Sequence, residues 1–290
     1  MTPFRETKKL AQAMPRSEFP QDHCVKVSAI AVCIILTHFS GCRPKIYDPS
    51  SEVWTAVTTN DTSSLARLLK EYPGMETFER GGETILHEAA LNQDLKTVEV
   101  IVRAEADINA VNRYQETPLQ CAIQRNRPDV VEFLLAESAD WRLEDHLGQT
   151  PLMNASSHGF IEVMKVLIDH GVDVDHRVGN RQTALHQAAN SRQAEAIDTL
   201  LAAGAQVDIL DNRLRTPLCI LMDRFSDVKA AGEDDIDVRI VKTLLAAGAD
   251  PNKANLVEES PASLARKYQD VAPRCAELLG VKTGRAAAPK

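Results

Sequence analysis

The stretch TPLQCAIQRN, residues 117–126, has a close counterpart 33 residues later in TPLMNASSHG, residues 150–159. Counting back two periods from the first of these units leads to Ser51. A fixed period of this length indicates a chain of repeated units, each of which buries its apolar face only against its neighbours. Related motifs recur as TILHEAA, TALHQAA and TPLCILM, which begin at Thr84, Thr183 and Thr216.

Each unit is expected to contain two helices. The threonine supplies an N-cap hydroxyl, and the proline that often follows it is well placed at the first helical position. Five residues after each threonine, a small residue lets neighbouring first helices approach closely: Ala89, Ala122, Ala155 and Ala188. Seventeen residues after it, an apolar pair places the second helix in the core: Ile101-Val102, Leu134-Leu135, Leu167-Ile168 and Leu200-Leu201.

These units resemble the ankyrin repeat from about Ser51 to Leu279. The resemblance implies an all-α solenoid of about seven units, each with a helix-turn-helix and a β-hairpin finger, the first and last acting as caps. The unit after Thr216 starts at Ser260, 44 residues later, so eleven residues are inserted around DVKAAGEDDID, residues 227–237. The aligned pair Leu244-Leu245 shows that the register resumes after them.

Glycines after the second helices suit left-handed caps, as at Gly171, Gly204 and Gly248. Glu105 and Ser138 occupy the equivalent positions in two other units. A side chain in the left-handed conformation costs about 1 kcal/mol. We therefore expect these two helix ends to be rearranged.

The composition fits a helical domain of ordinary core size. The chain has 290 residues, of which 44% are apolar and only 4% aromatic, which favours small-residue helix packing over aromatic-rich strands. The formal net charge of -8 would repel a phosphate backbone, so no nucleic acid is expected as a partner. The six cysteines form no metal-ligand motif, and neither a metal nor a cofactor is expected.

The segment before the repeats contains a 13-residue apolar run, residues 27–39, followed by Ser40, Gly41 and Cys42. The run has the length of a signal-peptide core and is too short for a spanning helix. It resembles a bacterial lipoprotein signal with its lipobox, which implies cleavage before Cys42 and lipidation of its sulfur. Arg43 at the next position implies, by the same resemblance, sorting to the outer membrane, facing the periplasm.

This interpretation divides the chain into four parts: a signal peptide with a long n-region (1–41), a lipidated tether (42–50), the ankyrin domain (51–279) and a disordered tail (280–290). Phe39 stands where the lipobox usually has leucine, and 26 residues precede the apolar run. Two alternatives therefore stay open. In the first, the apolar run of residues 27–39 is a helix packed on the first repeat. In the second, the chain is a cytosolic ankyrin adaptor or effector.

No motif for catalysis is found, and the chain is not expected to be an enzyme. His87 and His186 fall at the T-x-x-H position of the repeat, where the resemblance implies that the ring braces the unit. GEDDID, residues 232–237, lacks the alternating ligands of an EF-hand loop, so a solvated acidic loop is the better interpretation. Cys121 and Cys219 lie three units apart and are expected to be small core residues.

By resemblance, ankyrin arrays bind proteins in a concave groove formed by the finger tips and the first helices. Tyr114, Arg125, Arg213 and Arg224 are the expected hot spots, since Tyr and Arg combine contact area with directional polar groups. The full set of matching positions is Arg113, Tyr114, Glu116, Gln124, Arg125, His146, Leu147, His158, Asn180, Asn190, Asn212, Arg213 and Arg224.

The leading hypothesis is a monomeric, non-catalytic, membrane-tethered binding protein of the bacterial envelope. Similarity to ankyrin-type lipoproteins that accompany antibacterial toxins implies an immunity protein that inhibits an effector such as a lipase. The alternative is an envelope scaffold or stress-protection protein with several weak partners.

Overall fold

The computed structural model describes residues 48–226 and 235–281. These residues form seven helix pairs, which confirms the predicted all-α repeat architecture. The pairs are α3 (Ser50–Thr58) with α4 (Thr62–Glu71), α5 (Ile85–Asn92) with α6 (Leu95–Arg103), α7 (Pro118–Gln124) with α8 (Pro128–Ala136), α9 (Pro151–His158) with α10 (Ile161–Asp169), α11 (Ala184–Asn190) with α12 (Ala194–Ala202), α13 (Pro217–Asp223) with α14 (Asp235–Ala246), and α15 (Pro261–Lys267) with α16 (Pro273–Leu278).

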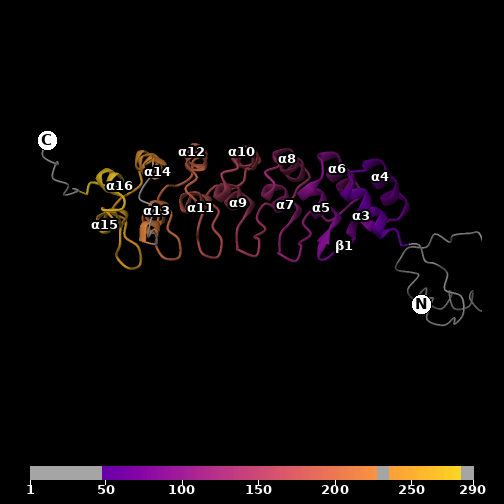
Figure 1. The fold of residues 1–290 in the computed structure, drawn as a ribbon, viewed down its shortest axis with the longest axis horizontal. Helices are drawn as coiled ribbons and strands as arrows, with labels where there is room; N and C mark the ends of the chain where they lie inside the picture. The colour runs from indigo at the N-terminus through magenta and orange to yellow at the C-terminus, as the bar shows by residue number, and fades with distance from the viewer. Residues whose placement is uncertain (1–47, 227–234, 282–290) are drawn as a thin grey trace, which may run out of the picture. The chain divides into compact units, whose positions relative to one another are not determined.

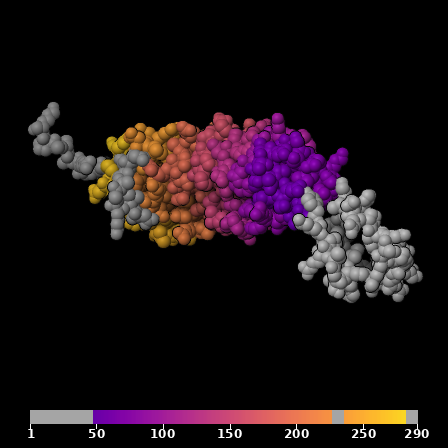
Figure 2. All heavy atoms as spheres, turned by 45° about the vertical axis from the view of Figure 1, so that its right-hand side comes forward, coloured from indigo at the N-terminus to yellow at the C-terminus, as the bar shows by residue number. Residues whose placement is uncertain are grey.

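The helices from α3 to α16 form two parallel layers (Figure 1). The odd-numbered helices from α3 to α15 pack one against the next in an inner layer, and the even-numbered helices form the outer layer. In Figure 2 the colours of the described helices follow one another in chain order, because each unit contacts mainly its neighbours. The 33-residue period therefore corresponds to one helix pair of the stack.

The core lies between these layers, at the positions that the repeat predicts. All four of the predicted inner-helix alanines are fully buried. Of each apolar pair, the first member is buried and the second is half-buried, as with Leu134 and Leu135 on α8. The outer helices thus contribute one fully buried residue per pair rather than two.

The inner helices begin as expected in most units. The hydroxyls of Thr84, Thr117 and Thr216 accept a hydrogen bond from the amide of the third helical residue, at 3.4, 3.3 and 3.1 Å. Thr150 occupies the N-cap of α9 without such a bond. The first unit also differs, because α3 begins at Ser50 after Pro49, so Ser51 lies inside the helix and does not cap it.

The expectation of rearranged ends at Glu105 and Ser138 is wrong. Both residues adopt left-handed φ angles of 65° and 71°, like the glycines in the equivalent units. The amide of Ala139 reaches the carbonyl of Leu134 at 2.9 Å, as the amide of Ala205 reaches Leu200 at 3.0 Å. The repeat geometry therefore imposes the left-handed cap even where a side chain strains it.

We call the segments between successive helix pairs the first to sixth fingers: residues 72–84, 104–117, 137–150, 170–183, 203–216 and 247–260. All of them extend from the same side of the inner layer (Figure 1). The first contains the 3-10 helix η2 (Met75–Thr77) and an antiparallel pair of strands, β1 (Glu79–Arg80) and β2 (Glu83–Thr84). A second 3-10 helix, η3 (Arg224–Ser226), follows α13.

The described part of the chain ends slightly beyond the predicted domain. Gly280 adopts a left-handed φ of 76°, and Val281 is buried, with its amide bonded to the carbonyl of Ala276 at 2.9 Å. These two residues close α16 and do not belong to a tail. The predicted signal peptide and Cys42 lie outside the described residues, and no described helix is long and apolar enough to cross a membrane.

Candidate partner-binding surface

Most of the predicted binding residues are exposed on the fingers or at the ends of the inner helices. Tyr114 keeps 46% of its surface exposed and Leu147 keeps 67%. Large apolar groups in water at neighbouring finger tips are suited to contact with another protein. The exposed set is Arg113, Tyr114, Gln124, Arg125, His146, Leu147, His158, Asn180, Asn190, Asn212 and Arg213.

Tyr114 is the centre of a small cluster on the second and third fingers. The guanidinium of Arg113 lies over its ring, 4.8 Å from the centroid, and the His146 ring centroid is 6.3 Å away. The amide of His146 donates to the carbonyl of Tyr114 at 3.3 Å, which links the two finger tips. The cluster holds an aromatic ring in place while leaving nearly half of it accessible.

The fourth and fifth fingers are linked in the same way. The amide of Asn212 donates to the carbonyl of Asn180 at 2.9 Å. Asn180 also accepts the amide of Gln182 at 2.9 Å with its side-chain oxygen. Arg213 follows Asn212 at an exposed tip. Neighbouring fingers thus support one another and hold these polar side chains at fixed spacing.

On the inner helices, the predicted residues cluster at the C-terminal ends. Arg125 caps α7 and is exposed. His158 ends α9, where its Nδ1 lies 2.9 Å from the carbonyl of Asn154 and its ring stacks on Phe160 at 5.2 Å. Asn190 is the exposed last residue of α11.

Glu116 is not an exposed groove residue, contrary to its prediction. It is buried at the end of the second finger, where one carboxylate oxygen accepts from Gln124 and the other from Asn112 at 3.3 Å. Its backbone carbonyl lies 2.8 Å from Nε2 of His87 in the preceding unit. Glu116 therefore connects finger and helix, and only its partner Gln124 faces solvent.

Arg224 is also engaged within the fold, because its Nη1 lies 3.4 Å from Oδ1 of Asp237. The same carboxylate receives Nε and Nη2 of Arg192 at 2.7 and 3.1 Å. Asp237 belongs to the segment predicted as a solvated acidic loop, yet its side chain is only 2% exposed. That interpretation is wrong for Asp237, which joins the fifth unit to the sixth, whereas residues 227–234 lie outside the described ranges.

Sequence reasoning missed a second repeated position, which lies five residues before the capping residues Thr117, Thr150, Thr216 and Ser260. A buried or half-buried Asn or Asp there accepts two backbone amides across the finger turn, as Asp145 does from Leu147 and Gln149 at 2.8 and 2.9 Å. Asn112, Asp211 and Asn255 make the same pair of bonds. The sequence spacing contained this signal, but Glu79 in the first finger and Val178 in the fourth interrupt it.

Asp211 also forms an ion pair, with Arg215, which its counterparts Asn112, Asp145 and Asn255 do not form within the described ranges. Burial by itself would raise the pKa of its carboxyl group, but hydrogen bonds from Arg215 outweigh that effect and lower the pKa. Nε and Nη2 of Arg215 donate to Oδ2 at 3.0 and 2.9 Å. The fifth finger is thus held by an ion pair, in which two guanidinium nitrogens share one carboxylate oxygen, as well as by its turn.

His87 and His186 brace neighbouring units, as the resemblance implies. Nδ1 of each ring accepts the amide of its capping threonine, at 3.3 Å from Thr84 and 3.1 Å from Thr183, so the proton lies on Nε2. Nε2 then donates to the next unit, at 2.8 Å to the carbonyl of Glu116 and 3.1 Å to that of Arg215. Burial, which disfavours the charged ring, lowers both pKa values.

Gln120 occupies the same position in the third unit and reproduces the brace. Its side-chain oxygen accepts the amide of Thr117 at 2.7 Å. Its side-chain nitrogen donates to the carbonyls of Leu143 and Gln149, at 2.9 and 3.4 Å. The position therefore needs an acceptor and a donor but no charge.

The surroundings of the described cysteine thiols do not favour the thiolate form that a nucleophile needs. Cys121, Cys219 and Cys275 are buried and form no disulfide with one another. Burial raises the pKa of Cys121 strongly and that of Cys219 to about 12, so both stay protonated at neutral pH. Within residues 48–226 and 235–281, no group of three or more His, Cys, Asp or Glu side chains is arranged to hold a metal ion.

Comparison with known proteins agrees with this architecture. The family model described as "Ankyrin repeats (3 copies)" matches residues 53–145 and 135–211, which is more than half of the chain. The search of curated proteins finds no significant match.

Among solved structures, an ankyrin repeat domain from Acinetobacter baumannii AYE is 27% identical, with a TM-score of 0.59, covering 68% of this chain and 98% of that one. The ankyrin domain of Bcl-3, a member of the IkappaB protein family, has a TM-score of 0.68 at 21% identity, covering 79% and 97%. Human ASB11 has a TM-score of 0.63 at 24% identity, covering 81% and 99%. At these identities, the last two show similarity of fold alone.

Proposed function

Because the chain belongs to the ankyrin repeat family, whose members are protein interaction modules, we propose that it is a non-catalytic protein that holds one protein partner against its fingers and inner helices. The observation that carries the proposal is the cluster at Tyr114. Its ring is held by Arg113 and by the neighbouring finger, yet 46% of the residue is exposed. An ordered aromatic side chain loses little conformational entropy on binding, which favours it as an anchor.

Three of the four predicted hot spots stay in the proposal. Tyr114, Arg125 and Arg213 are exposed on the second finger, the end of α7 and the fifth finger. Arg224 is withdrawn, since a partner would have to compete with its ion pair to Asp237. We expect the replacement of Tyr114 and Arg125 by alanine together to weaken partner binding by at least about tenfold.

Capture with the full chain tests the binding role. The wild-type chain is expected to retain one protein in a one-to-one ratio, and the variant Tyr114→Ala/Arg125→Ala is expected to lose it. Glu162→Ala/Lys165→Ala is the control, because these residues form an exposed ion pair at 2.7 Å on the outer helix α10. Equal loss in both variants, or no loss in either, would contradict the assignment of the surface.

The location of the protein is a further part of the proposal. The apolar run before Ser40, Gly41 and Cys42 supports lipidation of Cys42, and Arg43 supports placement in the outer membrane, facing the periplasm. A short tether from Cys42 to the first helix would keep the array near that membrane. Mass spectrometry of the mature N-terminus tests this directly, with an acylated Cys42 expected. An intact Met1 would instead support the cytosolic adaptor or effector.

The more specific proposal is an immunity protein that covers the active site of a toxin such as a lipase. It rests on the likeness to ankyrin-type lipoproteins that accompany antibacterial toxins and on the proposed tether. Deletion of the gene is expected to make cells sensitive to attack by sibling cells, and a deletion without that effect would overturn the immunity role. Many substoichiometric partners in the capture experiment would support an envelope scaffold instead.

A further inference from the structure

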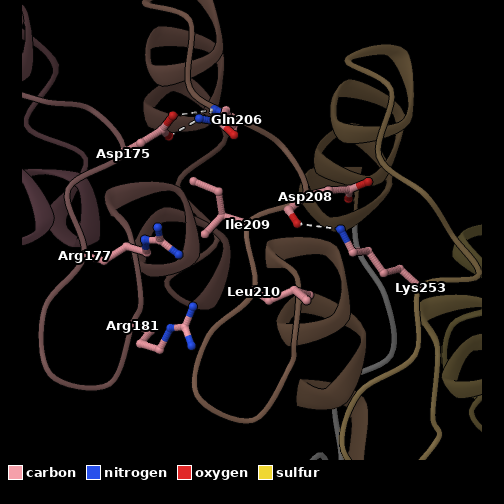
Figure 3. A pocket seen from close by; sticks show the side chains of 8 residues that line it. All are labelled: Asp175, Arg177, Arg181, Gln206, Asp208, Ile209, Leu210 and Lys253. Carbon is pink, nitrogen blue, oxygen red and sulfur yellow. Dashed lines mark hydrogen bonds between the residues drawn. The ribbon is translucent and has the colours of Figure 1, made fainter.

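A cavity of about 310 Å³ lies between the fourth and fifth fingers and reaches the sixth (Figure 3). Arg177 and Arg181 line it from the fourth finger, Ile209 and Leu210 from the fifth, and Lys253 from the sixth. Figure 3 shows the side chains of Arg177 and Arg181 both extending from their finger toward the fifth. The cavity thus has a cationic wall beside an aliphatic one.

The two guanidinium groups of this cationic wall are unpaired within the described ranges. Asp175 also lines the cavity, but its carboxylate is directed to the fifth finger, where it accepts the amide of Gln206 at 3.0 and 3.3 Å. Arg177 and Arg181 make no side-chain hydrogen bond or ion pair with any residue of 48–226 or 235–281. Both groups are therefore available to a ligand.

At the opposite end of the cavity, the Lys253 ammonium and one carboxylate oxygen of Asp208 have partners, while Asp208 Oδ1 has none among the described residues. Nζ of Lys253 donates to the backbone carbonyl of Asp208 at 2.9 Å. The Asp208 carboxylate accepts the amide of Asp250 at 3.0 Å and, in Figure 3, points away from Arg177 and Arg181. An anion would accordingly bind at the end of the two arginines, where this carboxylate does not face it.

We infer that this cavity binds an acidic segment of the partner protein, in which carboxylate side chains alternate with aliphatic ones. The inference deepens the proposed binding role and rests on it. The planar guanidinium groups of Arg177 and Arg181 match carboxylates in a two-pronged geometry. Ile209 and Leu210 are half-buried and would cover the aliphatic side chains between those carboxylates.

A free small anion fits this cavity less well than a peptide. The cavity is open to water, and an exposed ion pair contributes only about 0.2 to 1 kcal/mol. A lone phosphate would gain little more than that. A segment that also buries aliphatic groups against Ile209 and Leu210 adds the hydrophobic contribution that a phosphate lacks.

The test is a titration of the full chain, followed by NMR, with a capped hexapeptide of alternating glutamate and leucine. The same peptide with glutamine in place of glutamate removes only the charge, and inorganic phosphate supplies only the charge. The variant Arg177→Gln/Arg181→Gln removes the cationic wall. Arg67→Gln is the matched control, because Arg67 is an exposed arginine of the outer helix α4 that neither lines the cavity nor belongs to the proposed binding surface.

We expect the glutamate peptide to bind, and the double variant to bind it about fivefold more weakly, corresponding to two exposed ion pairs. Arg67→Gln is expected to change the affinity by less than about twofold, since its charge does not reach the cavity. Equal binding of the glutamine peptide, binding of phosphate as tight as that of the peptide, no binding at all, or an equal effect of Arg67→Gln would each overturn the inference. Because the probe is synthetic, such a failure leaves the capture experiment on Tyr114 and Arg125 unaffected.

Discussion

Asp237 offers the sharpest test of how the stack is held together after the insertion. Its carboxylate accepts hydrogen bonds from two guanidinium groups, of Arg192 in the fifth unit and Arg224 in the sixth. Asp235 begins the same helix, pairs with Arg274 at 2.8 Å and has a side chain that is 91% exposed. Asp237→Asn and Asp235→Asn therefore make the same chemical change in a buried and in an exposed ion pair.

The expected cost follows from the burial of the three groups. Removing one partner of a buried ion pair costs about 3 to 5 kcal/mol. The Arg192 and Arg224 side chains keep 26% and 31% exposure, so water replaces part of what they lose. We therefore expect Asp237→Asn to lower the free energy of unfolding by about 2 to 3 kcal/mol. The exposed pair of Asp235 is screened by solvent, and its variant should differ from wild type by no more than experimental error.

Urea unfolding of the full chain, followed by far-UV circular dichroism, measures both variants. Repeat arrays unfold in parts when an interface weakens, so hydrogen exchange of α14, α15 and α16 should be followed alongside. In Asp237→Asn, the exchange of these helices is expected to accelerate more than that of α5 and α7. If Asp237→Asn costs as little as Asp235→Asn, the cluster does not couple the fifth and sixth units, and the reasoning fails.

Three further predictions concern the repeat itself. Burial lowers the pKa of His87 and His186 below the unfolded value of about 6.5, so below that pH the unfolded chain binds more protons than the folded chain. The free energy of unfolding should therefore decrease as the pH falls, by up to about 1.4 kcal/mol per pH unit for each ring. The variant His87→Gln/His186→Gln, which places the side chain of Gln120 at both positions, should remove this slope, and an identical slope in the variant would contradict the account. Ser138→Gly should stabilise by about 1 kcal/mol by relieving its left-handed strain, and a lower melting temperature would count against it. Leu134→Ala should cost about 2 to 5 kcal/mol because the side chain is fully buried, whereas an unchanged melting temperature would show that the register is wrong.

Much of the fold could be predicted because the period reports burial directly. A small residue recurs five positions after each threonine, and an apolar pair recurs seventeen positions after it, so both must face the same environment in every unit. Ala122 and Leu134 are fully buried for that reason. The left-handed ends at Glu105 and Ser138 show the same dominance of the repeat geometry over local preference.

The rest depends on contacts that the period does not encode. Asp237 contacts Arg192 across 45 residues and from the end of the insertion, where the 33-residue period assigns no role to either residue. Glu116 looked variable because its side-chain identity changes from unit to unit. Its backbone carbonyl, however, is the acceptor for the brace from His87, which draws the residue into the fold. Exposure at such a position follows from neighbouring units and not from the residue type.

Hydrogen exchange of the captured complex, compared with the free chain, tests the central claim most directly. Binding by the fingers and inner helices predicts slower exchange at residues 112–116 and 145–149 and in the last turns of α7 and α9. The outer helices α8 and α10 should exchange at the same rate with and without the partner. Protection confined to those outer helices would contradict a binding surface on the finger side.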